Sequence, residues 1–306
     1  MSDRLVLQEG AAIGSSPTFA DRQNWLISLQ RFTKPWLVRI GIVVVLLVLV
    51  IAVTAPWISP YDPLQQAIAE RMRPPLWTGR WGLHPLGTDH LGRDVLSRIF
   101  YGARISIVIS FGGTLVAAAV GTVAGLVAGF AGGWVDDLVM RLVDLQLTFP
   151  FILLALAVLA LLGASELNII SVLALSGWPI YARTGRASVL SLKETTWVEA
   201  AKCIGVTSRR ILFRHILPNA ASPLIVVSSF QLAQMIILES ALGFLGLGIQ
   251  PPTPTWGNML ADGRAYITDS WWLPVFPGLA IVLTAAGINF VGDGLRHALD
   301  PRASEY

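Results

Sequence analysis

One acidic side chain stands inside an apolar stretch of the sequence, where a carboxylate could bind and release a proton. Glu239 ends the run SSFQLAQMIILE. A carboxylate at the centre of a bilayer costs on the order of 3 kcal/mol, so such a residue marks a pathway or an interface by default. With about 100° between successive residues, one helical face carries the candidates for a translocation pathway: Ser228, Gln231, Met235 and Glu239.

Two interpretations of Glu239 are open at this point. As a titrating group within the bilayer, it would suit a channel or an ion-coupled transporter. Near the outer end of its helix, the same carboxylate would reach water or cap a neighbouring helix. The sequence does not fix its depth, so both interpretations stand.

Residues for other kinds of chemistry are sparse. No lysine belongs to the glycine-rich loop that cradles ATP phosphates, so we do not expect this chain to hydrolyse ATP by that route. The four histidines lack the spacing of a catalytic zinc site. His84, Asp89 and His90 are scattered loop residues and do not define a site for a soft divalent metal. We therefore expect no metal, no cofactor and no catalytic residues in this chain.

A charged segment, WVEAAKCIGVTSRRILFRHILPN at 197–219, interrupts the apolar sequence. Its first part predicts a short helix that a threonine caps, with Glu199 in the early turns and Gly205 at the end. Its second part predicts another helix over 207–218, with an apolar side and a basic side. Pro218 is expected to end this helix. The sequence thus predicts a compact pair of helices outside the membrane.

The surface that this pair of helices contacts is the next question. Its arginines would favour a position on anionic lipid. The acid beside the small Ala200–Ala201 pair instead leaves a shallow surface suited to docking into another protein, which is the interpretation we prefer. The only cysteine, Cys203, has no partner for a disulfide within the chain. We expect it to be a small buried residue.

Membrane helices must hold these groups in place. The chain has 306 residues, of which 54% are hydrophobic and 13% charged, whereas soluble domains average roughly 25% charged residues. A hydrocarbon core about 30 Å thick requires about 20 helical residues per crossing. Runs of this kind predict an all-α integral membrane protein with six transmembrane helices, near 36–57, 104–130, 147–163, 169–187, 220–247 and 273–293.

The distribution of charge indicates the orientation of these spans. With the amino terminus in the cytoplasm, most lysines and arginines fall on the inner side, as the positive-inside rule requires. The first apolar run begins only at Trp36 and lacks a cleavage pattern, so we expect a retained helix and no signal peptide. The net charge of +3 is explained by basic residues at helix ends, and we expect no binding of nucleic acid.

Small residues form a ridge along the second predicted span. The run GTLVAAAVGTVAGLVAGFAGG places small side chains at intervals of four, with Gly121, Gly125 and Gly129 at its centre. In lipid this spacing lets two helix backbones approach closely. The spacing does not distinguish packing within the chain from packing against a second subunit.

An irregular outer elbow follows the fifth predicted span. The sequence ALGFLGLGIQPPTPTWGNML combines glycines and prolines that a regular helix cannot accommodate. Trp256, Trp271 and Trp272 are expected to anchor this region at the depth of the membrane interface.

The charged segment also carries a resemblance to a known family. The triplet Glu199-Ala200-Ala201 is followed by Gly205 and by Leu217-Pro218, and His215 stands where the usual pattern has isoleucine, a common variant. From about residue 36 the chain resembles the permease subunits of bacterial ATP-binding-cassette importers, in the dipeptide, oligopeptide and nickel branch. Three further stretches carry this resemblance: HPLGTDHLGRDVLSRIFYGARIS, GFLGLGIQPPTPTWGNML and NFVGDGLRHALDPR.

The resemblance implies a type I ABC importer permease fold (MetI-like) in the bacterial inner membrane, with both termini in the cytoplasm. The implied organisation is a cytoplasmic tail over 1–35, a first transmembrane helix over 36–57, a periplasmic loop over 58–103, a permease core over 104–293 and a cytoplasmic tail over 294–306. Within the core, 183–218 would be the cytoplasmic coupling loop. The residues implied to face an ATPase subunit there are Glu199, Ala200, Ala201, Gly205, Arg209, Arg210, His215 and Pro218.

The implied function is ATP-driven import of a dipeptide or oligopeptide from the periplasm. The implied partners are a second homologous permease subunit, two cytoplasmic ATPase subunits that bind ATP and magnesium, and a periplasmic substrate-binding protein. Nickel, glutathione and opine-like compounds are alternative substrates within the branch. An ion-coupled transporter or channel is the alternative from another class.

Overall fold

The structure, a computed structural model, describes residues 32–33, 35–76 and 84–299. Nearly all of the tail predicted over 1–35, and the chain from 300 onward, lie outside the described residues. Within these ranges the fold is all-helical, with one isolated β-bridge between Thr88 and Asp94. The elements are α2 (Trp36–Ile58), η1 (Ile68–Glu70), α3 (Val95–Ala131), α4 (Gly133–Thr148), α5 (Phe151–Leu162), α6 (Glu166–Lys193), α7 (Thr196–Cys203), α8 (Ser208–Ile211), the π-helical turn η3 (Leu212–Ile216), α9 (Leu217–Phe244), α10 (Trp256–Arg264) and α11 (Trp272–Leu299).

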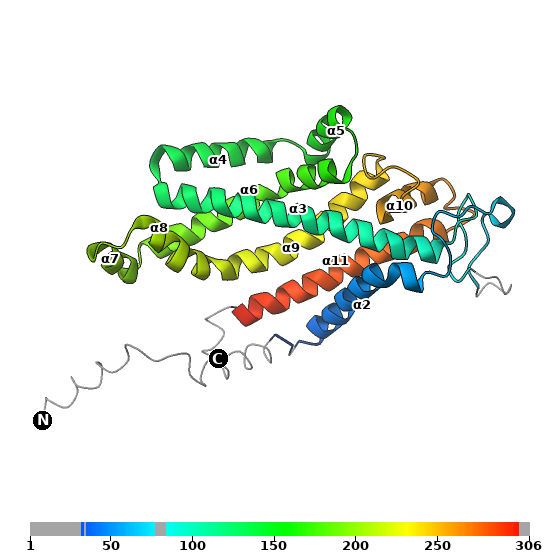
Figure 1. The fold of residues 1–306 in the computed structure, drawn as a ribbon, viewed down its shortest axis with the longest axis horizontal. Coiled ribbons are helices and arrows are strands. Elements are labelled where there is room, and N and C mark those ends of the chain that lie inside the picture. Colours follow the sequence, from blue (N-terminus) through cyan, green and yellow to red (C-terminus); the bar gives the residue numbers. More distant parts are fainter. Residues whose placement is uncertain (1–31, 34, 77–83, 300–306) are drawn as a thin grey trace, which may run out of the picture.

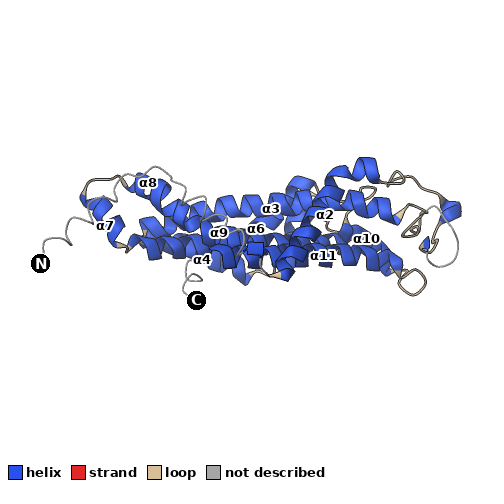
Figure 2. Ribbon diagram, turned by 90° about the horizontal axis from the view of Figure 1, so that it is seen from below, coloured by secondary structure: helices blue, strands red, loops and turns tan. Residues whose placement is uncertain are grey.

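The long helices run side by side in an elongated bundle (Figure 1). At one end, α7 and α8 project beyond the other helices, and at the opposite end lie the irregular loop before α3 and the short helix α10. The view from below shows the same two ends, separated by the full length of the bundle (Figure 2). The charged segment and the outer loop are therefore at opposite ends of the molecule.

Fewer helices qualify as spans than the six predicted. Four helices are long and apolar enough to cross a membrane, namely α2, α3, α9 and α11, and a fifth crossing results if α4 and α5 are counted together. The remaining long helix, α6, has 28 residues but carries Arg183, Arg186 and Lys193 in its second half. These charges lower its hydropathy, so the count within the described residues is four or five by length and composition.

The third predicted span, 147–163, is wrong as a straight helix. The chain forms α4 and α5 here, with 91° between them at the break. Pro150 lies at this break, and it has no N–H to continue a helix and restricts Phe149 to an extended conformation. With 12 residues, α5 is about 18 Å long, too short to cross a hydrocarbon core of about 30 Å alone.

Three helices, α3, α6 and α11, extend six or more residues beyond their predicted limits. Helix α3 begins at Val95, inside the stretch 58–103 that was expected to be a loop, because Asp94 caps it by accepting a hydrogen bond from the Ser97 N–H at 2.7 Å. Its 37 residues span about 55 Å, well beyond the thickness of the hydrocarbon core. Helix α11 likewise continues to Leu299, six residues past the end predicted at 293.

The glycine ridge of α3 packs against α6 within the chain. A Cβ at Gly121 would lie 2.3 Å from the Trp178 carbonyl oxygen, and one at Gly125 would lie 2.1 Å from the Ala182 carbonyl oxygen. Only glycine permits this approach of two backbones. The ridge therefore packs α3 against α6. Of the two possibilities that the sequence left open, the structure shows packing within the chain and not against a second subunit.

Candidate functional site

The projecting segment begins with the short helix α7. The Thr195 carbonyl oxygen accepts hydrogen bonds from the N–H groups of Val198 at 3.0 Å and Glu199 at 3.3 Å. After the helix, Gly205 has φ +79°, a left-handed conformation that favours glycine. The Val206 N–H then donates to the Ala201 carbonyl at 3.0 Å, the long-range bond of a glycine C-cap. The helix and its glycine stop are where the sequence predicted them.

The second helix of the segment does not end at Pro218, as had been predicted. Helix α8 continues into the π-helical turn η3, and η3 continues directly into α9. In η3 the Leu217 N–H donates a hydrogen bond to the Leu212 carbonyl, five residues earlier. Pro218 occupies the first turn of α9, where a missing N–H is tolerated. The wider turn accommodates the proline, so the projecting helix and the membrane helix are one continuous element.

The segment has its own apolar interior. Val198, Ile211 and Ile216 are 0% exposed, and they belong to the same buried cluster as Val189 of α6. A contiguous core of this kind holds the two short helices in a fixed position against the end of the bundle. We call residues 196–216 the inner projection.

The tip of the inner projection is exposed. Glu199, Ala200 and Gly205 are open to solvent, and Ile204 is 81% exposed. Cys203 is also exposed, so the prediction that it would be buried is wrong: the buried positions of this eight-residue helix lie on the side of Val198. A surface that combines one acid, small residues and an exposed isoleucine suits contact with another protein.

The second helix of the inner projection presents a basic hollow of about 440 Å³. It is lined by Thr207, Arg210, Phe213 and Arg214, and both arginines are exposed. The side chains of Arg209 and His215 lie outside the part of the structure that is described. The predicted basic side of this helix is therefore present at Arg210 and Arg214.

The four candidates for a translocation pathway face the interior of the bundle. Met235 is 0% exposed, and its Cε occupies the space that a side chain at Gly177 of α6 would need; Gln231 approaches the same glycine. Ser228 lies near Tyr181 of α6. These three residues thus line the contact between α9 and α6 in this conformation.

Glu239 lies close to the outer end of α9, five residues before Phe244. It is 1% exposed, with Ser106 of α3 against its carboxyl group and the Ser240 hydroxyl 3.4 Å from it. In this conformation the carboxyl group is enclosed by protein and does not reach water. Of the two interpretations of Glu239, this position favours a role in helix packing, and a role in a pathway stays a prediction.

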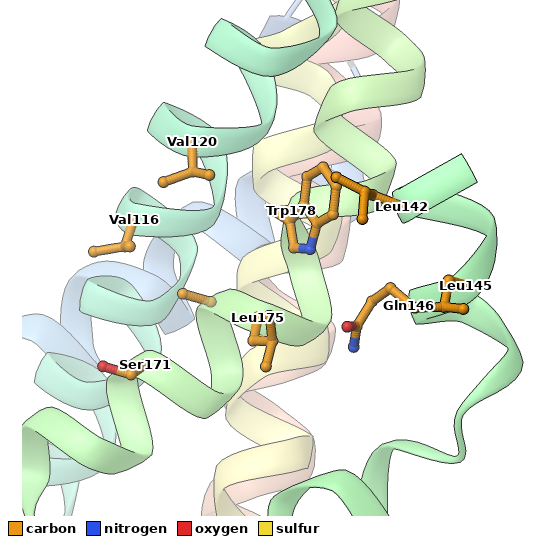
Figure 3. A pocket seen from close by; sticks show the side chains of 9 residues that line it. Val116, Val120, Leu142, Leu145, Gln146, Ser171, Leu175 and Trp178 are labelled. Carbon is orange, nitrogen blue, oxygen red and sulfur yellow. The ribbon is translucent and has the colours of Figure 1, made fainter. Parts of the chain in front are cut away.

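An apolar groove of about 480 Å³ separates α4 from the α3–α6 pair (Figure 3). Val116 and Val120 line it from α3, Leu142 from α4, and Leu175 and Trp178 from α6. Such a lining suits contact with lipid chains or with another apolar helix.

Two ion pairs tie α4 to α6 beside this groove. Arg186 makes a bidentate pair with Asp136, through Nε at 2.5 Å and Nη2 at 2.6 Å, and Arg183 Nη2 lies 2.6 Å from Asp144. Arg183 and Arg186, in the second half of α6, are therefore paired with carboxylates on α4, and this pairing lowers the cost of placing their charges near the membrane.

Buried charges hold the outer loop against the helix ends. Asp89 accepts hydrogen bonds from Arg93 Nε at 2.6 Å and from the Arg93 N–H at 2.9 Å, and Arg98 Nε lies 3.6 Å away. Asp262 of α10 approaches both guanidinium groups, at 3.6 and 3.8 Å. Arg93 and Arg98 are only 4% and 3% exposed, so this network is a structural element and not a solvated surface.

His84 links two carboxylates in the same loop. Its Nδ1 lies 2.9 Å from Asp94 and its Nε2 lies 3.0 Å from Glu70. Because both ring nitrogens already have partners, His84 is not available as a metal ligand in this arrangement, and no group of three metal-binding side chains occurs in the described ranges.

Two tryptophans that were expected at the membrane interface are instead buried. Trp256 is 1% exposed and donates from Nε1 to the Ile99 carbonyl at 3.1 Å, and Trp272 is 5% exposed and donates to the Thr88 carbonyl at 3.3 Å. Each ring tethers the outer elbow to a distant part of the chain. Of the three, Trp271 alone is substantially exposed, at 43%.

Comparison with known proteins identifies the family. The model of the binding-protein-dependent transport system inner membrane components matches residues 121–305. The chain belongs to this family of permeases. A second family model, the N-terminal transmembrane domain of oligopeptide transport permease C, matches residues 24–75 of this permease.

Relatives of the permease cover nearly its whole length. The di/tripeptide transport system permease protein DppC of Pseudomonas aeruginosa (strain UCBPP-PA14) is 43% identical over 86% of this chain and 87% of its own. The dipeptide transport system permease protein DppC of Alkalihalophilus pseudofirmus is 40% identical over 91% and 90%. The glutathione transport system permease protein GsiD of Escherichia coli O6:K15:H31 is 41% identical over 92% and 91%.

A solved structure supports the fold. An inward-facing conformation of the MetNI methionine ABC transporter contains a chain that aligns with this permease with a TM-score of 0.55. The alignment covers 66% of this permease and 96% of that chain, at 18% identity. At this identity the likeness concerns the fold alone, and it agrees with the MetI-like fold that the sequence predicted. The family and its helices make this permease a multi-pass protein of the inner membrane.

Sequence reasoning missed the buried network of the outer loop in this permease. Asp89, Arg93 and Arg98 were visible as charges in a loop, but their partner Asp262 lies more than 160 positions later. The alternation of acid and base in GTDHLGRDVLSR was the available signal. Its pairing depends on the tertiary structure, which brings α10 to the start of α3.

Proposed function

We propose that this permease imports small peptides from the periplasm to the cytoplasm, driven by ATP. The dipeptide and di/tripeptide transport permeases named above support this substrate class, whereas the glutathione transport permease fits the alternative of glutathione. These substrates share a short peptide backbone with charged ends. This agreement supports a peptide over the nickel and opine-like alternatives.

The inner projection would couple the permease to its ATPase. Its exposed tip would contact an ATPase subunit through Glu199, Ala200, Ala201 and Gly205. Arg209, Arg210 and His215 on its second helix, and Pro218 in the first turn of α9, would complete the surface. The observation that carries this proposal is the continuity of α8, η3 and α9, together with the core shared with α6. A displacement of the tip would thus enter two membrane helices at once.

The complete transporter would contain more than this chain. We expect a second homologous permease subunit, two ATPase subunits that bind ATP and magnesium, and a periplasmic substrate-binding protein. ATP can bias the permease only by favouring one of its conformations, so the ATPase pair would draw the two inner projections together. Both termini would be cytoplasmic, because α2 begins and α11 ends toward the end of the bundle that carries the inner projection (Figure 1).

Reconstitution tests this function against the ion-coupled alternative. The permease, its partner permease, the ATPase subunits and the binding protein would be incorporated into liposomes, and uptake of a labelled dipeptide measured. We expect uptake that requires ATP and continues when an ionophore removes the proton gradient. Uptake that persists without ATPase subunits and stops with the ionophore would show the ion-coupled mechanism instead.

A further inference from the structure

A second polar feature lies at the outer end of the bundle, away from the inner projection and from the buried charges of the outer loop. A hollow of about 240 Å³ opens between α3 and the start of α6. Arg104, Ile105, Val108 and Ile109 line it from α3, and Glu166 lines it from the first turn of α6. The hollow thus has an apolar floor and one charge of each sign.

The two charges are not neutralised by each other. Neither Arg104 nor Glu166 has an ion-pair or hydrogen-bond partner for its charged group among the described residues, and both side chains are exposed. Arg93, Arg98 and Arg186 differ in this respect, since each faces a carboxylate. An unpaired acid and an unpaired base across one hollow are complementary to a ligand that carries both charges.

A larger hollow adjoins the first. Its volume is about 530 Å³, and Ile105 lines both hollows. Tyr61 and Tyr101 provide aromatic surface, and Pro254 adds an apolar wall. Tyr101 precedes Arg104 by three residues, so the two side chains lie on one face of α3. The combined surface offers charged groups beside room for side chains of varied shape, as pockets for small polar ligands do.

We propose that these hollows form a site on the outer face that receives the zwitterionic backbone of a short peptide. Arg104 binds the terminal carboxylate, for which a guanidinium is well suited, and Glu166 binds the terminal ammonium. A dipeptide separates its two ends by up to about 7 Å, and because both charges line the same hollow, one molecule bound there would face both of them. The side chains of the peptide occupy the larger hollow beside Tyr61 and Tyr101. The substrate class in this inference rests on the proposed function.

Photolabelling of the assembled transporter tests the site. The probe is a dipeptide with a free amino terminus and a carboxyl-terminal benzoylphenylalanine, applied without binding protein, and the labelled residues are located by mass spectrometry. We expect labelling between residues 59 and 64 and around Tyr101. Arg104→Ala and Glu166→Gln should each reduce it about tenfold, whereas Arg104→Lys retains part of it. Arg141→Ala, which removes an exposed arginine from α4, serves as the matched control and should leave labelling unchanged.

Competition by unlabelled peptides distinguishes recognition of the charged peptide termini from nonspecific binding. An unlabelled dipeptide should suppress labelling of the unmodified transporter, and its amidated and N-acetylated forms should be at least tenfold weaker. Equal competition by the blocked peptides, or labelling that Arg104→Ala and Glu166→Gln leave intact, would overturn this site. ATP-driven uptake of the dipeptide by the same preparation is measured in parallel. If the preparation takes up no peptide, the proposed function fails, and the labelling result still decides whether the hollow binds a zwitterion.

Discussion

The outer loop and the inner projection hold their shapes by different means. In the outer loop, residues 59–76 and 84–94 are held by buried ions and tryptophan hydrogen bonds, with Asp89 in contact with Arg93 and Arg98. The inner projection, 196–216, is fixed by a small apolar core around Ile211 and leaves its polar groups in solvent. One region uses its charges for structure, and the other leaves its charges free to bind.

This difference predicts which substitutions affect stability and which affect transport. Removing one member of a buried ion network leaves an uncompensated charge, whereas removing an exposed side chain changes little in the folded chain. Substitutions in the outer loop should therefore destabilise the permease. Substitutions at the tip of the inner projection should reduce transport while the chain stays folded.

The largest effect is expected for Asp89→Ala. Arg93 and Arg98 would lose the nearer of their two shared carboxylates and keep only Asp262, at 3.6 and 3.8 Å. Breaking a buried ion network in this way typically costs about 3–5 kcal/mol. Thermal unfolding of the purified permease measures the change. The matched control is Asp144→Ala, which removes an ion pair whose side chains are 65% and 51% exposed and should cost less than about 1 kcal/mol. Equal effects of the two substitutions would contradict the contrast drawn here.

Alanine at two glycines compares the two regions directly. Gly92 in the outer loop has φ +77°, and a Cβ there would lie 1.9 Å from the Ala67 carbonyl oxygen; Gly205 has φ +79° with nothing within 4 Å. Both substitutions incur the left-handed penalty of about 1–2 kcal/mol, and Gly92→Ala adds overpacking of roughly 1–3 kcal/mol. Unfolding measurements should therefore rank Gly92→Ala well above Gly205→Ala. The reverse order would show that the outer loop is the more adaptable region.

Glu199→Ala should change transport more than stability. Glu199 is exposed, and loss of its contact with an ATPase subunit should lower ATP-driven uptake at least about tenfold, equivalent to about 1.4 kcal/mol. Glu194→Ala is the control, since it removes an exposed acid that follows α6 and precedes α7. Normal uptake by the Glu199→Ala permease, inserted in normal amounts, would count against the coupling role.

The smallest expected effect is on the loss of stability at acidic pH, and it involves Glu70. The hydrogen bond from His84, and then the charge of Arg73, hold the pKa of Glu70 below its ordinary value of 4.5. A lowered pKa in the folded chain means that Glu70 adds stability above pH 4.5, and that this contribution is lost as pH falls through the lower folded value. The unfolding temperature of Glu70→Gln should thus decline less below pH 4.5 than that of the unmodified permease. Identical declines would show that Glu70 does not contribute.

The sequence predicted those parts of the fold that depend on local pattern. Gly205 as a helix stop and the close packing of Gly121 and Gly125 follow from residue type and spacing. The cap at Asp94 was not predicted, because 58–103 was expected to be a loop. Both errors at prolines have a physical reason. Pro150 bends the chain between α4 and α5, whereas Pro218 is accommodated by a preceding π-helical turn. The sequence alone does not show which prolines receive such an adjustment.

Contacts between segments that are distant in the sequence could not be predicted from the sequence. The pairing of Asp262 with Arg93 and Arg98, and the burial of Trp256 against Ile99, depend on how α10 folds back onto α3. The candidate coupling residues were visible because they are close in sequence. The hollow between Arg104 and Glu166 was not, because its two charges come from helices that begin about 70 positions apart.

Because α8, η3 and α9 form one continuous helical element, a small tilt at its inner end produces a larger displacement at its outer end. Helix α9 has 28 residues and is about 42 Å long, so a tilt of roughly 5° imposed at its inner end sweeps the outer end through about 4 Å. A hinge at Pro218 would have absorbed such a rotation before it reached the membrane. Under the proposed coupling, a small rearrangement at the inner projection would therefore become a displacement of several ångströms at the opposite end of α9.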